Sequence, residues 1–446
     1  MRNIFDQYSQ NENRLSHALA SILQLDVDLR RSFMKEFIPA EGRPDASRVG
    51  VSEQSYPGQP SMAEEEAERR GLPDIWLFED QGWCAVIECK ITAPLLSDQI
   101  VRHCRLARRQ DFKLIVPVAI SILEPADALP SDVIQIRWTD IYVWLKAHAS
   151  PRNWAELAAR YFETLEVQMI ENGQLDRGTL TTFSGFPFAT LEDYSYGEAK
   201  RVLRLALDEL AKDKRLEKEI GIDPMIPGRG AIKGRNSDNV WDVLQIKEAS
   251  RATNHTSNVH LTLSITRRHV AAWTVVPYGL DPKIRQSFAK LSLEQFFDLL
   301  ATLSTAMAPI LAIVPLASPS IMVLQRRWLF RSKPPVTDCE LIFDMRTALS
   351  GGAVKTQQEW AKAAHSALTA PKSNLEVLFG IVFPYDRCPE IRDQKAVDLI
   401  SASWRSCTPI FNIGILLVRA GTYNPQALRS IKTSATAAFR ASMAPK

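Results

Sequence analysis

The chain has 446 residues and a mass of 50.1 kDa, more than one ordinary hydrophobic core accommodates, so we expect two or three domains. Hydrophobic residues make up 46% and charged residues 24%, which is typical of a globular protein and excludes a disordered or fibrous chain. The net charge of +3 excludes a globally basic coat, so any nucleic-acid surface must be a local patch.

Cysteine usage and hydropathy exclude further classes. The six cysteines form no CxxC pair and no His/Cys cluster at zinc spacing, which favours a reducing compartment over a disulfide framework or structural zinc. The N-terminus is polar, which predicts no signal peptide. The longest apolar stretch, roughly residues 306–324, is interrupted by Pro309, Pro315 and Pro319, so we expect no membrane span. These features predict a cytoplasmic protein.

The first 165 residues show the pattern of an α/β domain with a mixed central sheet. One segment, about 40–70, is rich in Pro, Gly and Ser and ends in an acidic run, which indicates a mobile loop or a short solvated helix. The other predicted elements, in chain order, are a helix within 3–25, a hairpin of strands 75–78 and 83–90, a helix at 96–109, strands at 114–120 and 133–138, a helix from a Thr139-Asp140 cap to about 148, and a helix at 152–172.

The predicted hairpin carries the strongest chemical signal in the chain. Asp74 begins the first strand, and Glu88 and Lys90 end the second. Residues two apart on a strand share a face, so Glu88 and Lys90 point the same way, and closing the hairpin brings Asp74 near Glu88. The two carboxylates and the backbone carbonyl of Cys89 would be hard oxygen ligands for Mg²⁺ or Mn²⁺. Lys90 would orient water or neutralise charge on a phosphate. The alternative is a surface hairpin with incidental charges.

Pro73-Asp74 and Glu88-Cys89-Lys90 resemble the signature of the PD-(D/E)xK nuclease superfamily, over about residues 1–150. The resemblance implies a restriction-endonuclease-like αβββαβ core and adds two site residues. Glu12 is similar to a metal-site glutamate that many members carry on an N-terminal helix, and Gln99 to a glutamine on the helix after the lysine strand in RecB-like members. Both residues, by the alternative interpretation, lie on solvated helix faces.

A basic series on the predicted 96–109 helix suggests contacts to backbone phosphates. It comprises Arg102, Arg105 and Arg109, with Arg108 beside them. Gln99 and Arg102 lie about one helical turn apart, on one face, which is equally compatible with a solvated surface. His103 is interpreted as a structural or phosphate-side residue, because the mechanism that the resemblance implies needs no histidine base.

The remaining residues predict an α+β region, divided into 166–320 and 321–446. Strands are expected at 240–247, 258–265 and 269–276, and a helix at about 292–307. A Gly/Arg/Asn-rich loop at 225–239 carries Arg229, Lys233 and Arg235. It is either a phosphate clamp or a basic surface loop, and it is not a Walker A sequence because no Gly-Lys-Ser/Thr follows its glycines.

An internal repeat suggests that this region contains two similar modules. Pro-Tyr-x-x-x-Pro-x-Ile-Arg occurs at 277–285 and again at 384–392, each time after an apolar strand. Chance similarity is the alternative. The repeated proline and tyrosine are most simply the corner where a strand gives way to a helix.

Together these features predict a Mg²⁺- or Mn²⁺-dependent nuclease that cuts DNA, with RNA as the alternative substrate. By analogy with the superfamily, it would serve in restriction or anti-phage defence, with the C-terminal region recognising a target, a nucleotide or a phage-derived trigger. A homodimer is expected, because cutting two strands with one site per chain needs two chains. The alternative function is a non-cleaving nucleic-acid-binding or assembly protein that uses the fold as a platform.

Overall fold

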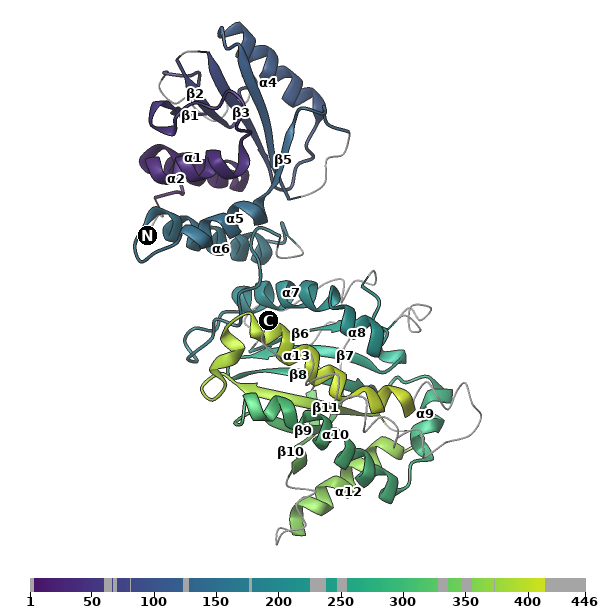
Figure 1. Cartoon of the computed structure of the whole chain (residues 1–446). Coiled ribbons are helices and arrows are strands. Elements are labelled where there is room, and N and C mark those ends of the chain that lie inside the picture. The colour runs from purple at the N-terminus through teal and green to yellow at the C-terminus, as the bar shows by residue number, and fades with distance from the viewer. Residues whose placement is uncertain are drawn as a thin grey trace. The chain divides into compact units, whose positions relative to one another are not determined.

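The computed structural model describes residues 4–59, 66, 70–80, 82–122, 128–175, 179–224, 238–246, 255–327, 336–346, 355–372 and 374–413 (Figure 1). The chain divides into two compact units, Met1–Thr182 and Phe183–Lys446. Each unit has its own sheet and its own hydrophobic core. We describe each unit by itself.

Unit 1 contains a five-stranded mixed sheet. Its strands are β1 (Gly50–Glu53), β2 (Ile75–Glu79), β3 (Trp83–Lys90), β4 (Leu114–Ser121) and β5 (Ile134–Arg137), adjacent in that order. The pairs from β1 to β3 are antiparallel, and those from β3 to β5 are parallel. The parallel step from β3 to β4 requires a crossover, which α4 (Ser97–Arg109) provides. The mixed sheet predicted from the sequence is confirmed.

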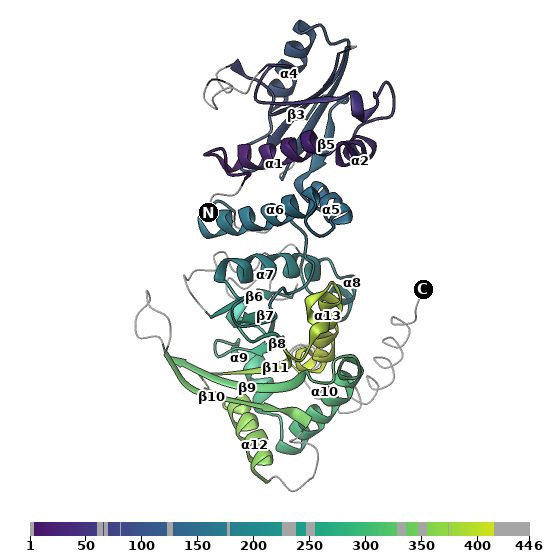
Figure 2. The ribbon, with the colours of Figure 1, turned by 90° about the vertical axis from the view of Figure 1, so that its left-hand side faces the viewer.

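The two faces of this sheet are covered by different helices (Figures 1 and 2). Alternate residues of β3 divide between them: Ala85, Ile87 and Cys89 belong to the main core, whereas Cys84 and Val86 pack with Ala107 of α4. The main core includes residues of α1 (Asn11–Leu25), α2 (Val27–Phe37), α5 (Trp138–His148) and α6 (Trp154–Glu171). The end of β3 therefore lies between α1 and α4.

The structure of unit 1 differs from the sequence predictions at three places. In its described part, the 40–70 segment contains a 3-10 turn, η1 (Ala46–Arg48), and the edge strand β1, whose four half-buried residues give no clear alternation. Most of the acidic run at its end lies outside the described residues. The helix α2 was not predicted. The predicted Thr139-Asp140 cap is also wrong, because α5 begins at Trp138 and the Asp140 carboxylate accepts a hydrogen bond from the Arg137 N–H at 3.1 Å.

The helix α6 runs across position 165, where the sequence division was placed. Its buried Glu166 accepts hydrogen bonds from the backbone N–H of Leu180 at 2.7 Å and of Thr181 at 3.3 Å. These bonds satisfy a buried carboxylate and attach the following segment to α6, so the first unit extends to Thr182.

Unit 2 contains a six-stranded antiparallel sheet in the order β10-β9-β11-β8-β7-β6. The strands are β6 (Asn239–Leu244), β7 (His260–Thr266), β8 (His269–Val276), β9 (Ser318–Arg327), β10 (Val336–Asp344) and β11 (Leu375–Pro384). The helices are α7 (Tyr196–Ala211), α8 (Lys214–Glu219), α9 (Pro282–Ala289), α10 (Leu293–Ile313), α12 (Lys355–Thr369) and α13 (Lys395–Ser406), with 3-10 turns η3 (His255–Ser257) and η4 (Pro389–Arg392). The sequence predicts a division of this region at position 320. The structure joins strands from both sides of that position in one sheet.

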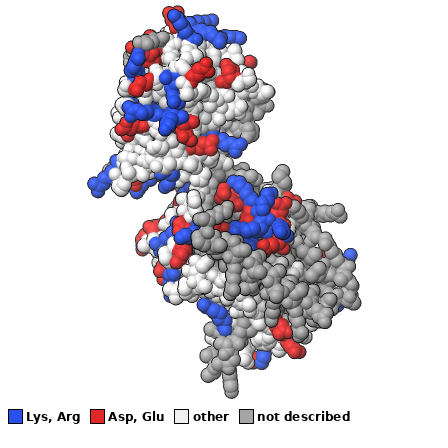
Figure 3. All heavy atoms as spheres, viewed as in Figure 1, with Lys and Arg blue, Asp and Glu red and all other residues white. Residues whose placement is uncertain are grey.

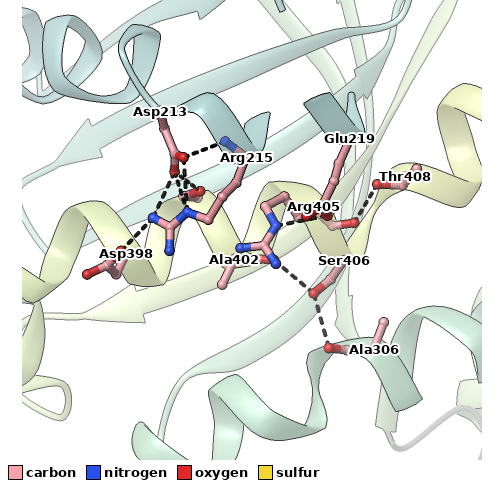
Figure 4. Close-up of polar contacts among 10 residues, drawn as sticks. Asp213, Arg215, Glu219, Ala306, Asp398, Ala402, Arg405, Ser406 and Thr408 are labelled. Carbon is pink, nitrogen blue, oxygen red and sulfur yellow. Dashed lines mark hydrogen bonds and ion pairs between the residues drawn. The ribbon is translucent and has the colours of Figure 1, made fainter. Parts of the chain in front are cut away.

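Ion pairs join α8 to α13 in unit 2 (Figure 4). The Arg215 guanidinium lies 2.9 Å from an Asp213 oxygen and 2.6 Å from an Asp398 oxygen, and Arg405 Nε lies 2.9 Å from Glu219 Oε2. Ser406 Oγ donates to the Ala306 carbonyl of α10 at 3.1 Å. Hydrogen bonding to Arg215 and Ser401 outweighs burial and lowers the pKa of Asp213. The network fixes α13 against its neighbours.

The repeated Pro-Tyr segments occupy equivalent places beside the two central strands. The two copies of the repeat are offset by 107 positions, so Gly380 of β11 is the repeat equivalent of Trp273 of β8. These two residues also pair with each other across the two strands. A local twofold axis through this pair therefore relates the two strands. Arg285 donates to the Tyr278 carbonyl at 3.0 Å, and Arg392 donates to the Tyr385 carbonyl at 2.6 Å. The repeated arginines thus make the same contact, although an α-helix, α9, follows the first corner and a 3-10 turn, η4, follows the second.

The helix α10 has the length and apolar composition of a membrane span, with a mean hydropathy of 1.8 over its most apolar 18 residues. One face of it, including Phe296, Leu300, Leu303 and Met307, packs in the core of unit 2. A core helix can satisfy the same criteria of length and composition, and a third of this apolar window is buried inside unit 2.

The buried His260 at the start of β7 is expected to make unit 2 sensitive to acid. Its ring Nδ1 lies 3.0 Å from the Asn258 carbonyl, and burial lowers the pKa of His260 to about 4. An unfolded histidine titrates near 6.5. Above that pH the residue is neutral in both states and has no effect. As the pH falls from about 6.5 to about 4, only the unfolded chain takes up the proton, so the free energy of unfolding decreases.

By pH 5 this loss should reach about 2 kcal/mol. Urea unfolding of the full-length protein and of His260→Gln, measured at pH 7.5 and pH 5, checks the prediction. The variant should lose less stability between the two pH values than wild type does. Equal losses in the two proteins would show that His260 is not the group responsible.

Candidate active site

The strand register brings Asp74 and Glu88 together. Ile75 of β2 pairs with Ile87 of β3, so the preceding Asp74 stands across from the following Glu88. Both carboxylates are buried, with relative exposures of 9% and 4%. One oxygen of Asp74, Oδ2, accepts a hydrogen bond from the Cys89 N–H at 2.7 Å. The hairpin thus fixes two acidic side chains where β2 begins and β3 ends.

Lys90 connects these residues to the helix α1. Its Nζ lies 2.8 Å from Glu88 Oε1 and 2.9 Å from Glu12 Oε1. The other Glu12 oxygen accepts from the Ile91 N–H at 2.9 Å, and the Trp138 indole donates to the Lys90 carbonyl at 3.1 Å. Glu12, in the first turn of α1, is 78 positions from Lys90 in sequence. The fold places Glu12 with Asp74, Glu88 and Lys90.

A residue that the sequence analysis did not assign to the site completes the surroundings of Glu88. His103 of α4 is 2% exposed, and its Nε2 lies 2.8 Å from Glu88 Oε2. The signal that would have found it is its spacing from Gln99. Residues four positions apart on a helix lie on the same face, so His103 shares the face of Gln99, which turns toward β3.

Carboxylates outnumber the single ammonium at this site, and the pKa values reflect the crowding. Burial, and then the neighbouring Glu88, raise the pKa of Asp74 well above its ordinary value. Burial alone would raise the pKa of Glu88, but the His103 hydrogen bond and the Lys90 charge lower it. Burial alone would lower the pKa of Lys90, but the surrounding carboxylates raise it, so Lys90 is charged at neutral pH.

The chemistry of this donor set fits Mg²⁺ or Mn²⁺. Glu12, Asp74 and Glu88 offer hard carboxylate oxygens, and a divalent cation would offset the burial and the Glu88 charge that raise the pKa of Asp74. Within the described ranges, however, no three His, Cys, Asp or Glu side chains are grouped as ligands around one point. Lys90 instead occupies the position between Glu12 and Glu88.

The other predicted site residues lie along α4. Gln99 is half-buried, and its Oε1 is enclosed without a hydrogen-bond partner among the residues that the structure describes. Arg102, Arg105 and Arg109 are exposed. A side chain added at Gly71 would lie 2.9 Å from Arg102 Nε, so this guanidinium adjoins the segment that leads to Asp74. Figure 3 shows Lys and Arg side chains gathered over α4.

The three cationic residues predicted in the C-terminal region, Arg229, Lys233 and Arg235, lie outside the described residues. Where the structure describes unit 2, opposite charges mix near α8, as the ion pairs of Arg215 and Arg405 illustrate (Figure 3). The cationic surface beside the candidate site is therefore the one on α4.

The chain was compared with known proteins. No model of a protein family matches it, and no curated protein resembles it significantly in sequence.

Proposed function

We propose that the chain is a metal-dependent nuclease that hydrolyses phosphodiester bonds of DNA, with a restriction-endonuclease-like core in unit 1. The observation that carries this proposal is the convergence of three carboxylates and one lysine at the end of β3. Lys90 Nζ lies within 3 Å of two of those carboxylates, and Asp74 stands across the hairpin from Glu88. A buried cluster of charges is weak evidence for a role in stability alone, which favours a functional role.

Each residue has a chemical role in this proposal. Glu12, Asp74 and Glu88 would hold Mg²⁺ or Mn²⁺, which when bound polarises a phosphate oxygen and lowers the pKa of a coordinated water. Lys90 stays charged and can neutralise negative charge that develops on the attacked phosphate. The hydrogen bond from the Cys89 N–H fixes Asp74 Oδ2 and so limits the rotation of that carboxylate.

The exposed arginines of α4 supply the contact with the substrate. Arg102 adjoins the segment leading to Asp74, and Arg105 and Arg109 continue along the same helix. Guanidinium groups bind backbone phosphates without reading the base sequence, so they would position a strand across the carboxylates. Sequence or target recognition would then lie elsewhere, and we assign it to unit 2.

A non-cleaving nucleic-acid-binding protein is the second candidate. The observation that favours it is the position of Lys90, which already neutralises Glu12 and Glu88 as a metal would. If no divalent cation displaces Lys90, the fold can serve as a binding platform only.

One experiment separates the two candidates. Full-length protein is incubated with labelled duplex DNA, single-stranded DNA and RNA, in Mg²⁺ or in EDTA, and both retention and cleavage are measured. The nuclease proposal predicts cleavage of DNA in Mg²⁺ only, and its loss in Asp74→Ala and Lys90→Ala. Binding with no cleavage in Mg²⁺ or Mn²⁺ would favour the platform, and equal cleavage by all three proteins would refute this site.

A further inference from the structure

The two oxygens of Glu88 are held by different elements. Lys90 of the same strand contacts Oε1, and His103 of α4 contacts Oε2, each at 2.8 Å. His103 is 2% exposed and Glu88 is 4% exposed, so water competes little for the second contact. A buried carboxylate oxygen without a donor is costly, which makes the His103 contact important for the ionised form of Glu88.

The surroundings of His103 indicate which ring nitrogen carries the proton. Its Nδ1 is buried and has no hydrogen-bond partner in the described part of the chain. A neutral imidazole has one N–H, and with no acceptor at Nδ1 the proton is best placed on Nε2, where it meets Glu88 Oε2. The ring thus acts as a donor to Glu88 that is fixed in direction.

This donor matters most when a cation engages Glu88. Lys90 and His103 share the carboxylate of Glu88. A cation bound at the Lys90 side would leave His103 as the group that sets the plane of the carboxylate. Groups that hold a metal-ligating carboxylate in this way typically change metal affinity or activity 10–100-fold when they are removed.

We propose that His103 is a positioning residue of the metal site, which donates from Nε2 to Glu88 Oε2 and so orients the opposite oxygen toward the divalent cation. This inference rests on the proposed nuclease function. It adds a contribution from α4, the helix that also carries the arginine row, and it couples the helix beside the substrate to a metal ligand on β3.

The test compares variants of His103 in the full-length protein. His103→Gln can place an amide N–H close to the position of Nε2, whereas the shorter His103→Asn cannot reach it, and His103→Leu has no donor. His148→Gln, at the exposed end of α5, is the matched control. Mn²⁺ binding is followed by electron paramagnetic resonance, and the Mg²⁺ dependence of cleavage is measured in parallel. Thermal unfolding identifies any variant whose fold is lost.

We expect His103→Asn and His103→Leu to bind Mn²⁺ about 10–100-fold more weakly and to need correspondingly more Mg²⁺. His103→Gln and the control should bind close to wild type. Wild-type affinity in all folded variants would overturn the positioning role. A His103→Gln variant as weak as His103→Leu would overturn it as well, because the donor would then not be what matters. Failure of the nuclease proposal itself looks different: wild type would bind no Mn²⁺ at this site and would cut no substrate.

Discussion

Replacing Lys90 with methionine is expected to reduce Mg²⁺-dependent cleavage by roughly 10²–10³-fold, the usual cost of removing one group that stabilises developing charge. Methionine keeps the length of the side chain and removes only the ammonium, which in the structure contacts Glu88 at 2.8 Å and Glu12 at 2.9 Å. Single-turnover cleavage of a labelled duplex at saturating Mg²⁺ measures the effect on chemistry separately from substrate binding.

The same variant should also show how Lys90 and a cation share the site. Without Lys90, Glu88 is left buried with His103 alone, and the fold should lose on the order of 3 kcal/mol of stability in EDTA. Added Ca²⁺ should raise the unfolding temperature of the variant more than that of wild type, because no ammonium competes for the carboxylates. Arg31→Met, which removes an exposed ion pair with Asp28 on α2, is the matched control and should change neither property. Full activity of Lys90→Met would remove Lys90 from the chemistry.

Replacing Gly380 with alanine is expected to destabilise unit 2 by about 3 kcal/mol or more. A Cβ at this position would lie 1.9 Å from the Ala272 carbonyl oxygen, which belongs to the backbone of the neighbouring strand β8. The strands cannot separate locally without breaking their ladder, because β11 pairs with β8 on one side and with β9 on the other. Chemical denaturation of the purified variant measures the loss.

A second glycine provides the control for Gly380. Gly221 has a φ of +82°, and a Cβ there would have no atom within 4 Å, so Gly221→Ala should cost only the backbone strain of about 1–2 kcal/mol. If Gly380→Ala is as stable as wild type, the strand pairing at Trp273 is not as described. The local twofold relation between the two central strands would then lose its support.

Much of unit 1 could be predicted from the sequence because its elements are long and regular. β3 and β4 are apolar runs bounded by polar turns, and the period of a strand is enough to place Glu88 and Lys90 on one face. The approach of Asp74 to Glu88 follows from the hairpin alone. The antiparallel strands of unit 2 that precede α10 were predicted for the same reason.

Other features depend on contacts that no local pattern contains. β1 is only four residues long and is held by pairing with β2, so its own residues give little sign of it. The contact of Glu12 with Lys90 spans 78 positions and could be expected only through the family resemblance. The contact of His103 with Glu88 depends on how α4 packs on β3, and the sequence offers only its spacing from Gln99.

We propose that Glu12, Asp74, Glu88 and Lys90 form a metal-dependent catalytic site. The most direct test is the rate at which full-length protein converts supercoiled plasmid to nicked or linear DNA in Mg²⁺, measured for wild type and for Asp74→Asn. This substitution removes a carboxylate charge and keeps the shape of the side chain. The predicted result is cleavage by wild type that EDTA abolishes, and no cleavage by Asp74→Asn at the same Mg²⁺ concentration. Equal rates for the two proteins would contradict the claim.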